Sequence, residues 1–449
     1  MALHGEVAPC EDKAARRVRC QSGLTPPRRA LCAGIVAALV LGAAACGSSG
    51  SPAGSAGSAA PAPVASSASA LGPEVRATGT PVKVGLITDG QNLNGSATGD
   101  EEPVAKATVP WLNEHMNGLA GHPITLDVCV DSLDPGKAAD CANQMISDNV
   151  VAVVIGSSGV IEASWKILHD AHIPVLNNAA TNTALLEDPA STFIVNDPIA
   201  QVVALPLAIA KNEHAKKVSV IVLDLPIATD IYKGSAPSLF KQNGLDLTVV
   251  PVPLGTPDMT PQTERIAVSN PDGLVTIVGD DQFCIAALNG LRAVGFHGSR
   301  FIISQCLTDA TRKALSGDAL QGILTVSLAP LGDNSDTSMR QYQAVLDKYA
   351  TSKVDSSDII GLMVFQSLGA LSVGTEGLKG AVTPASVAAT LKTMDNAVLP
   401  GSGGRHFRCN GKASTVRPAV CSVSVLVATL DGTGHPAKYA VENDGPIGE

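Results

Sequence analysis

One short loop carries residue types suited to gripping a small acid. The segment GSSG at 156–159 lies between an apolar run and a stretch with helical periodicity. Amide N–H groups at a helix start are unpaired, and with the Ser157 and Ser158 hydroxyls they form a cradle for a carboxylate. The alternative role is structural, because Ser-Ser-Gly turns also cap helices.

Two further loops bring polar groups to the ends of apolar runs. The segment NNAAT at 177–181 places the Ala179 carbonyl and the Thr181 hydroxyl beside the cradle. Asp280 and Asp281 follow another apolar run and offer carboxylates to a cation. The alternative for this acidic pair is a helix cap or a solvated loop.

The motifs of an enzyme are missing from the sequence. An α/β hydrolase needs G-x-S-x-G at a strand-to-helix turn, and the segment at 156–159 has a different spacing. No P-loop, H-E-x-x-H or dinucleotide-binding G-x-G-x-x-G after the first apolar run occurs. The histidines are scattered, and neither paired His nor C-x-x-C spacing indicates a metal site. We therefore expect a protein without catalysis, metal or cofactor.

The N-terminal segment predicts export and a lipid anchor. Two arginines precede an uncharged stretch at 30–45, which ends in small residues directly before Cys46. This arrangement resembles a bacterial lipoprotein signal, in which residues 1–45 are removed and the Cys46 thiol is lipidated. The stretch is shorter than the ~20 residues that a membrane-spanning helix needs. Residues 46–80, largely Gly, Ser, Ala and Pro, are expected to form a disordered tether.

Charge and cysteine content agree with an exported binding domain. Without residues 1–45, the chain has 25 Lys and Arg against 38 Asp and Glu, a net charge of −13, which disfavours nucleic acid and anionic membranes as partners. Six cysteines remain besides Cys46, in three couples that are local in sequence. In an oxidising compartment we expect disulfides between them. The expected pairs are Cys129–Cys141, Cys284–Cys306 and Cys409–Cys421.

Apolar runs alternate with stretches of helical length in two successive sets. Such alternation predicts parallel sheets with right-handed crossovers, and two sets imply two α/β lobes. Residues 337–400 are expected to be mostly helical, and β-rich sequence closes the chain. The predicted strands are 82–88, 124–130, 150–156, 218–224, 247–252, 273–279 and 301–304.

Three blocks of sequence resemble the branched-chain amino acid binding proteins of ABC importers, which are type I periplasmic binding proteins. They read VKVGLITDGQNLNG, DSLDPGKAADCANQMISDNVVAVVIGSSG and AHIPVLNNAAT. The resemblance implies two doubly wound lobes, joined by three hinge crossings, that close over a small ligand. It implies a first lobe of 81–198 and 328–400 and a second of 199–327 and 401–449.

The resemblance also implies which residues hold the ligand. In the first lobe, the positions that grip the carboxylate and ammonium of an amino acid are Ser157, Ser158, Ala179, Ala180 and Thr181. In the second lobe the chain departs from the family pattern. Ile231 stands where a ligand-covering tyrosine is usual, and Tyr232 fits only with a one-residue slip.

The position of the usual ammonium-binding acid falls on Gln305, and an aromatic position falls on Asp280 and Asp281. A neutral amide makes a weaker bond to a cation than a carboxylate does. Either an aspartate binds the cation instead, or the ligand has no ammonium group; amides, urea-like solutes and short acids are then candidates.

These patterns predict an extracytoplasmic, membrane-anchored solute-binding lipoprotein. It is expected to act as a monomer that delivers an amino acid or amide-like ligand to an ABC permease and ATPase. The alternatives are a tethered sensor of the same fold without transport, a structural surface lipoprotein, and an α/β enzyme.

Overall fold

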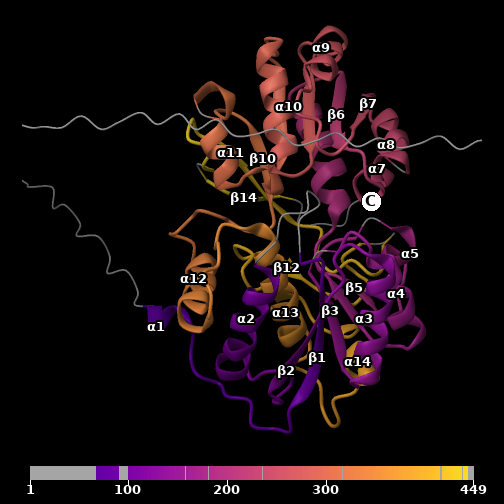
Figure 1. The fold of residues 1–449 in the computed structure, drawn as a ribbon, viewed down its shortest axis with the longest axis vertical. Helices are drawn as coiled ribbons and strands as arrows, with labels where there is room; N and C mark the ends of the chain where they lie inside the picture. Colours follow the sequence, from indigo (N-terminus) through magenta and orange to yellow (C-terminus); the bar gives the residue numbers. More distant parts are fainter. Residues whose placement is uncertain are drawn as a thin grey trace, which may run out of the picture. The chain divides into compact units, whose positions relative to one another are not determined.

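The computed structural model describes residues 67–90, 100–156, 158–180, 182–234, 236–315, 317–414, 417–436 and 438–442. Within these ranges the chain forms two large β-sheets, each flanked by helices, and one two-stranded sheet (Figure 1). The residues of the predicted leader at 1–45 and the predicted lipidation site Cys46 lie outside the described residues.

The first sheet has five parallel strands in the order β2-β1-β3-β4-β5. Each position of β3 is buried, as is typical of a strand with helices on both faces. The strands are β1 (Val82–Thr88), β2 (Ile124–Val130), β3 (Ala152–Ile155), β4 (Val175–Asn177) and β5 (Thr192–Ile194).

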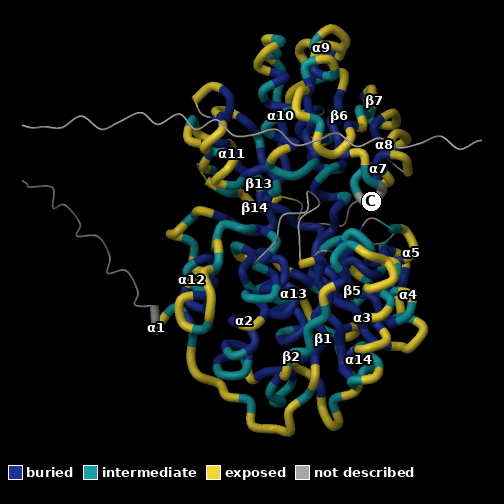
Figure 2. Tube along the Cα trace, viewed as in Figure 1, coloured by how far each residue is buried: buried dark blue, intermediate teal, exposed yellow. Residues whose placement is uncertain are grey.

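Helices cover both faces of the first sheet; β1, β3 and β4 are largely buried, whereas the edge strand β2 is mostly half-buried (Figure 2). Val84 and Leu86 of β1 pack in a cluster with residues of α2 and α13, whereas Ile87 packs with residues of α3 and α4. α3 begins after the N-cap Asp134, which accepts a hydrogen bond from the Lys137 amide (2.9 Å), and Pro135 fills its first helical position. The helices are α2 (Glu101–His115), α3 (Pro135–Ser147), α4 (Ile161–Asp170), α5 (Thr183–Leu186), α12 (Thr337–Tyr349), α13 (Ile359–Gly374) and α14 (Pro384–Leu391).

The second sheet has the order β14-β13-β10-β9-β8-β6-β7. Its central strands are parallel, while β13 and β14 add to one side as antiparallel strands from the end of the chain. At the opposite edge, β7 contains Pro251. The strands are β6 (Lys217–Leu223), β7 (Asp246–Val252), β8 (Leu274–Val278), β9 (Ser299–Ile303), β10 (Leu324–Ser327), β13 (Val425–Thr429) and β14 (Ala440–Glu442).

Helices alternate with the strands of the second sheet and complete a separate core. The fold class predicted from strand–helix alternation, two doubly wound α/β lobes, is therefore confirmed. The helical segments are η1 (Ala200–Ala204), α6 (Leu205–Asn212), α7 (Pro226–Lys233), α8 (Ala236–Gln242), α9 (Thr260–Ser269), α10 (Asp281–Ala293), η2 (Ser304–Cys306), α11 (Asp309–Ala314) and η3 (Gly317–Ala319).

The chain passes between the two lobes three times, at 195–199, 328–331 and 422–424. The Asp197 amide donates to the Ser422 carbonyl (3.0 Å), which joins the first crossing to the third. The Asp197 carboxylate also forms a buried ion pair with Arg417. Burial raises the pKa of Asp197 even though the Arg417 guanidinium opposes that rise.

The segment 401–424 packs differently from the expected division at residue 400. Phe407, Cys409 and Cys421 belong to the core of the first lobe. The strands β11 (Ala397–Val398) and β12 (His406–Phe407) pair across the expected boundary. The chain enters the second sheet only at β13.

The expected tether also ends earlier than residue 80. The short helix α1 (Ser67–Ala70) leads into Leu71, which is buried in the core of the first lobe. The Trp111 indole donates to the Leu71 carbonyl (3.0 Å), and the Val75 amide donates to the Glu114 carbonyl (2.9 Å). An apolar side chain and backbone hydrogen bonds therefore fix residues 71–77 along α2, and the Thr78 and Gly79 amides donate to the Gly121 carbonyl beyond it.

The structure joins the three expected cysteine pairs, with Cα–Cα distances of 5.5, 5.5 and 4.3 Å in chain order. In the described part of the chain, no helix combines the length and the apolar character needed to cross a bilayer. Across the same residues, no cluster of three or more His, Cys, Asp or Glu side chains is placed to hold a metal ion.

Candidate ligand-binding site

The first lobe offers a binding edge where its strand order reverses, between β1 and β3. Ligands of parallel α/β sheets bind beyond the carboxyl ends of strands at such a point. β3 ends at Ile155, and α4 begins at Ile161, so the predicted cradle lies at this edge. Ser158 is buried there, whereas Ser157 and Thr181 lie outside the described residues.

Two carboxylates of the protein itself occupy the donors of the predicted cradle. The Gly159 amide donates to the Asp89 carboxylate oxygens (3.3 and 3.1 Å), and the Ser158 hydroxyl donates to Asp131 Oδ2 (3.0 Å). Asp89 is 4% exposed and Asp131 is fully buried. The expectation that these donors face a ligand's carboxylate therefore differs from the structure, because acidic oxygens already accept their hydrogen bonds.

Asp89 and Asp131 were not predicted as site residues, although a signal for them exists. Asp89 directly follows β1 and Asp131 directly follows β2, and parallel neighbours end at the same edge. Burial first, and then the adjoining Asp131 carboxyl, raise the pKa of Asp89 well above its usual range. Near neutral pH the pair therefore retains a proton that two separate, solvated carboxylates would lose.

The loop after β4 lies at the same edge of the sheet. Ala179 is half-buried, and Ala180 is 2% exposed and packs in the core beneath α3 and α4. Asn178, just before them, is fully buried and donates to the Met363 carbonyl (3.3 Å) and Gln366 Oε1 (3.5 Å) of α13. The Asn178 side-chain amide, which was not predicted as part of the site, thus holds the loop against α13.

In the second lobe, the predicted ligand-covering residues belong to the core. Ile231 is 7% and Tyr232 is 2% exposed, and both pack in the cluster around the second sheet. The Tyr232 hydroxyl donates to the Val202 carbonyl (2.9 Å), and burial raises its pKa. This packing differs from the predicted role, since neither side chain is free to cover a ligand.

Asp280, Asp281 and Gln305 come together at the carboxyl edge of the second sheet. Asp280 caps α10 by accepting from the Phe283 amide (2.9 Å), so the helix-cap alternative holds for this residue. Its second oxygen, Oδ2, is buried without a hydrogen-bond partner among the described residues. Burial raises the pKa of Asp280.

Neighbouring groups hold the rest of this edge in place. Asp281 accepts from the Thr308 hydroxyl (2.9 Å), and Gln305 Oε1 accepts from the Ser304 hydroxyl (3.3 Å). The disulfide Cys284–Cys306 ties the first turn of α10 to the segment after β9. The strand order of this sheet reverses between β6 and β8, so the edge lies beside its own switch point.

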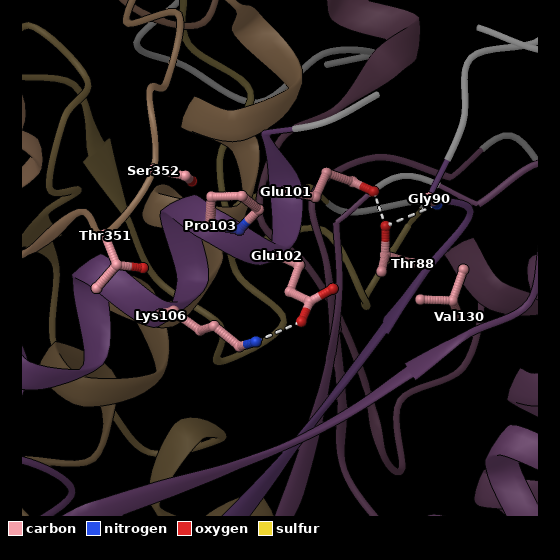
Figure 3. A pocket seen from close by; sticks show the side chains of 9 residues that line it. All are labelled: Thr88, Gly90, Glu101, Glu102, Pro103, Lys106, Val130, Thr351 and Ser352. Carbon is pink, nitrogen blue, oxygen red and sulfur yellow. Dashed lines mark hydrogen bonds and ion pairs between the residues drawn. The ribbon is translucent and has the colours of Figure 1, made fainter. Parts of the chain in front are cut away.

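The first lobe contains a cavity of about 320 Å³, which lies next to the loops of Asp89 and Asp131, where β1 and β2 end near the start of α2 (Figure 3). Within it, Thr88 and Glu101 point toward one another, and their side chains are hydrogen-bonded. Lys106 pairs with Glu102 at its outer side. None of the residues predicted from the sequence lines this cavity. The lining residues are Thr88, Gly90, Glu101, Glu102, Pro103, Lys106, Val130, Thr351 and Ser352.

Comparison with known proteins agrees with this architecture. A family model described as periplasmic binding protein matches residues 81–420. One similar solved structure is a solute-binding protein of an ABC transporter from R. palustris in complex with 4-hydroxybenzoate. Its sequence is 19% identical to this chain, and the two structures superpose with a TM-score of 0.64 over 82% of this chain and 98% of that chain. The leucine-binding protein LivK from Thermotoga maritima is 16% identical with a TM-score of 0.62, over 80% and 97% of the two chains.

The substrate-binding protein LivJ of a branched-chain amino acid transporter from Streptococcus pneumoniae, in complex with isoleucine, is 15% identical. Its TM-score is 0.62, over 81% of this chain and 99% of that chain. A search of curated protein sequences gives no match. At these identities the solved structures share the fold with this chain.

Proposed function

Because the chain belongs to the periplasmic binding protein family, we propose that it captures a small polar ligand between its two lobes and delivers it to an ABC importer. The observation that carries the proposal is the family match over 81–420, together with polar residues at the switch point of each sheet. The solved structures with bound 4-hydroxybenzoate and isoleucine support a small-molecule cargo.

The geometry of the first lobe favours a ligand that presents hydrogen-bond donors. Asp89 and Asp131 already accept the hydrogen bonds of Gly159 and Ser158. A ligand's carboxylate placed beside them would meet groups of like charge. An ammonium or amide N–H group is complementary to the same oxygens. Among the candidates from the sequence, we therefore favour an amino acid or an amide-like solute over a short organic acid.

A thermal-shift screen of the purified protein tests this function. The panel contains amino acids, aliphatic amides, urea and short organic acids at millimolar concentration. A ligand that binds only the folded protein stabilises it by about 2.7 kcal/mol at one hundred times its Kd. We expect an amino acid or an amide to raise the Tm and the short acids to leave it unchanged.

Failure of the whole panel to raise the Tm would contradict the binding function. A rise with the short acids alone would contradict the assignment of the ligand class while leaving the binding function intact. Delivery to an importer is tested separately, since cells that lack this protein should lose uptake of the same radiolabelled ligand. Retained uptake would favour a tethered sensor.

A further inference from the structure

One fully buried arginine touches each of the three crossings between the lobes. Arg405 Nη1 donates to Asn196 Oδ1 (2.8 Å) in the first crossing and to the Ser424 carbonyl (2.7 Å) in the third. Arg405 Nη2 donates to the Leu328 carbonyl (2.7 Å) in the second. These three partners are more than 90 residues apart in sequence, so a single side chain unites them in space.

The surroundings of Arg405 are unusual for a buried cation. Its three acceptors are uncharged, and no carboxylate pairs with it in the part of the chain that the structure describes. Its Nε is buried without a partner. Burial lowers the pKa of Arg405 to about 9. A guanidinium in such a place is costly, and its fixed fork of donors is what allows three separate segments to be held at once.

The same network reaches the loop of the candidate site. Asn196 Nδ2 donates to Asn178 Oδ1 (3.3 Å), and the Asn196 amide donates to the Asn178 carbonyl (2.9 Å). Asn178 directly precedes Ala179 and Ala180. Gln366 closes the network from α13, because it accepts from Asn196 (3.3 Å) and donates to the Leu328 carbonyl (2.8 Å).

We propose that Arg405 is a positioning residue that fixes the three crossings relative to one another and couples them to the loop after β4. When Arg405 is in place, a movement of one crossing strains its bonds to the other two, so the lobes share a defined hinge. When the Asn178 loop shifts, the displacement passes through Asn196 to the same guanidinium. The inference concerns the hinge and stands independently of the ligand class proposed above.

Hydrogen exchange followed by mass spectrometry on the full chain tests the coupling. In Arg405→Gln, we expect amides of all three crossings to exchange about tenfold faster, the factor that loss of one charge-assisted hydrogen bond produces in a local opening equilibrium. The Asn196 amide reports on the first crossing, and the Asp197 amide, which donates to the Ser422 carbonyl, reports on the contact between the first and the third. The Ala329 amide reports on the second crossing. Peptides from β1 and β6 should keep the parent rates.

Arg300→Gln is the matched control. Arg300 also donates to three carbonyl oxygens, those of Asp318, Ala319 and Gln321, but all three lie in one segment of the second lobe. This variant should speed exchange at 318–321 and leave the crossings unchanged. If Arg405→Gln affects a single crossing, or speeds exchange equally throughout both lobes, Arg405 is only a local structural residue and the proposal is wrong.

Asn196→Ala is a second variant that tests the same proposal if Arg405→Gln does not fold. It removes one acceptor of Arg405 and the side-chain link to Asn178, while it leaves the guanidinium bonded to Leu328 and Ser424. We expect faster exchange in the first crossing and in the peptide that contains Asn178, with a smaller rise in the other two crossings. Parent rates in the Asn178 peptide would overturn the coupling between site loop and hinge.

Discussion

Asp89 and Asp131 place two buried acidic groups next to each other, so that one retained proton affects the stability of the fold. A carboxyl whose pKa is higher in the folded than in the unfolded protein destabilises the fold as the pH rises between the two values. For Asp89 that interval runs from about pH 4 in the unfolded chain to about pH 8 in the folded protein. Stability gained from the retained proton is present at the acidic end and is lost toward the alkaline end.

We therefore expect Asp89→Asn to flatten the pH dependence of the free energy of unfolding. Asp89 should contribute a loss of at most ~1.4 kcal/mol per pH unit to the slope of the parent across this interval, and the variant, whose amide can still accept from Gly159, should lack this contribution. Urea unfolding at several pH values measures both slopes. The control is Asp272→Asn, an exposed carboxylate, which should keep the parent slope. Equal slopes in Asp89→Asn and the parent would contradict the shared proton.

At this scale the sequence predicts features that depend on local order better than contacts between residues far apart in the chain. The edge at 156–159 and the helix cap at Asp280 follow from local order along the chain. The partner of Ser158 does not, because Asp131 lies 27 residues away and only the pairing of β1 with β2 and β3 brings it there. The surroundings of Tyr232 are also set by distant residues: its aromatic ring packs in the core of the second lobe, and the Val202 carbonyl accepts from its hydroxyl.

Among the elements, the Cys284–Cys306 disulfide has the clearest consequence for the site. It joins α10 to η2 and thereby holds the Asp280 loop beside Gln305. Replacing both cysteines by alanine should cost about 3 kcal/mol, the loop-closure entropy of a bridge across 22 residues. It should also reduce the ligand-induced rise in Tm, because the two parts of the edge are no longer fixed together.

The double variant Cys129→Ala with Cys141→Ala is the comparison. This bridge spans 12 residues between β2 and α3, so a similar stability loss of about 3 kcal/mol is expected. It touches neither Asp280 nor Gln305, and the ligand-induced rise should stay at the parent value. An equal reduction in both double variants would show that general destabilisation, and not the position of the bridge, controls binding.

Most elements could be predicted, because apolar alternation and capping residues such as Asp134 are local signals. The position of 401–424 could not. This segment contains little regular secondary structure. Its place in the first lobe depends on the pairing of β12 with β11 and on the burial of Phe407 and Cys421. Contacts between distant segments, not periodicity, decide where such a stretch lies.

For the whole molecule, the lipoprotein signal predicted from the sequence before Ser67 leads to a test of where the two lobes operate. We propose that lipidation of Cys46 holds the protein at the membrane, where docking to an importer benefits from a raised effective concentration. The change Cys46→Ser should move the protein from the membrane fraction to the soluble fraction of lysed cells, as measured by immunoblotting. Cys32→Ser, a change within the same leader, should leave it with the membrane. Retention of the Cys46→Ser protein at the membrane would contradict the anchor.

Pro251 at the outer edge of the second sheet has a consequence for proteins that are crowded together. An edge strand presents unpaired N–H and C=O groups to which a strand of another molecule can add. β7 pairs only with β6 in the described sheet, and Pro251 has no N–H to donate. The row of donors along this edge is therefore interrupted, which hinders sheet-to-sheet aggregation between copies of the protein that lie close together.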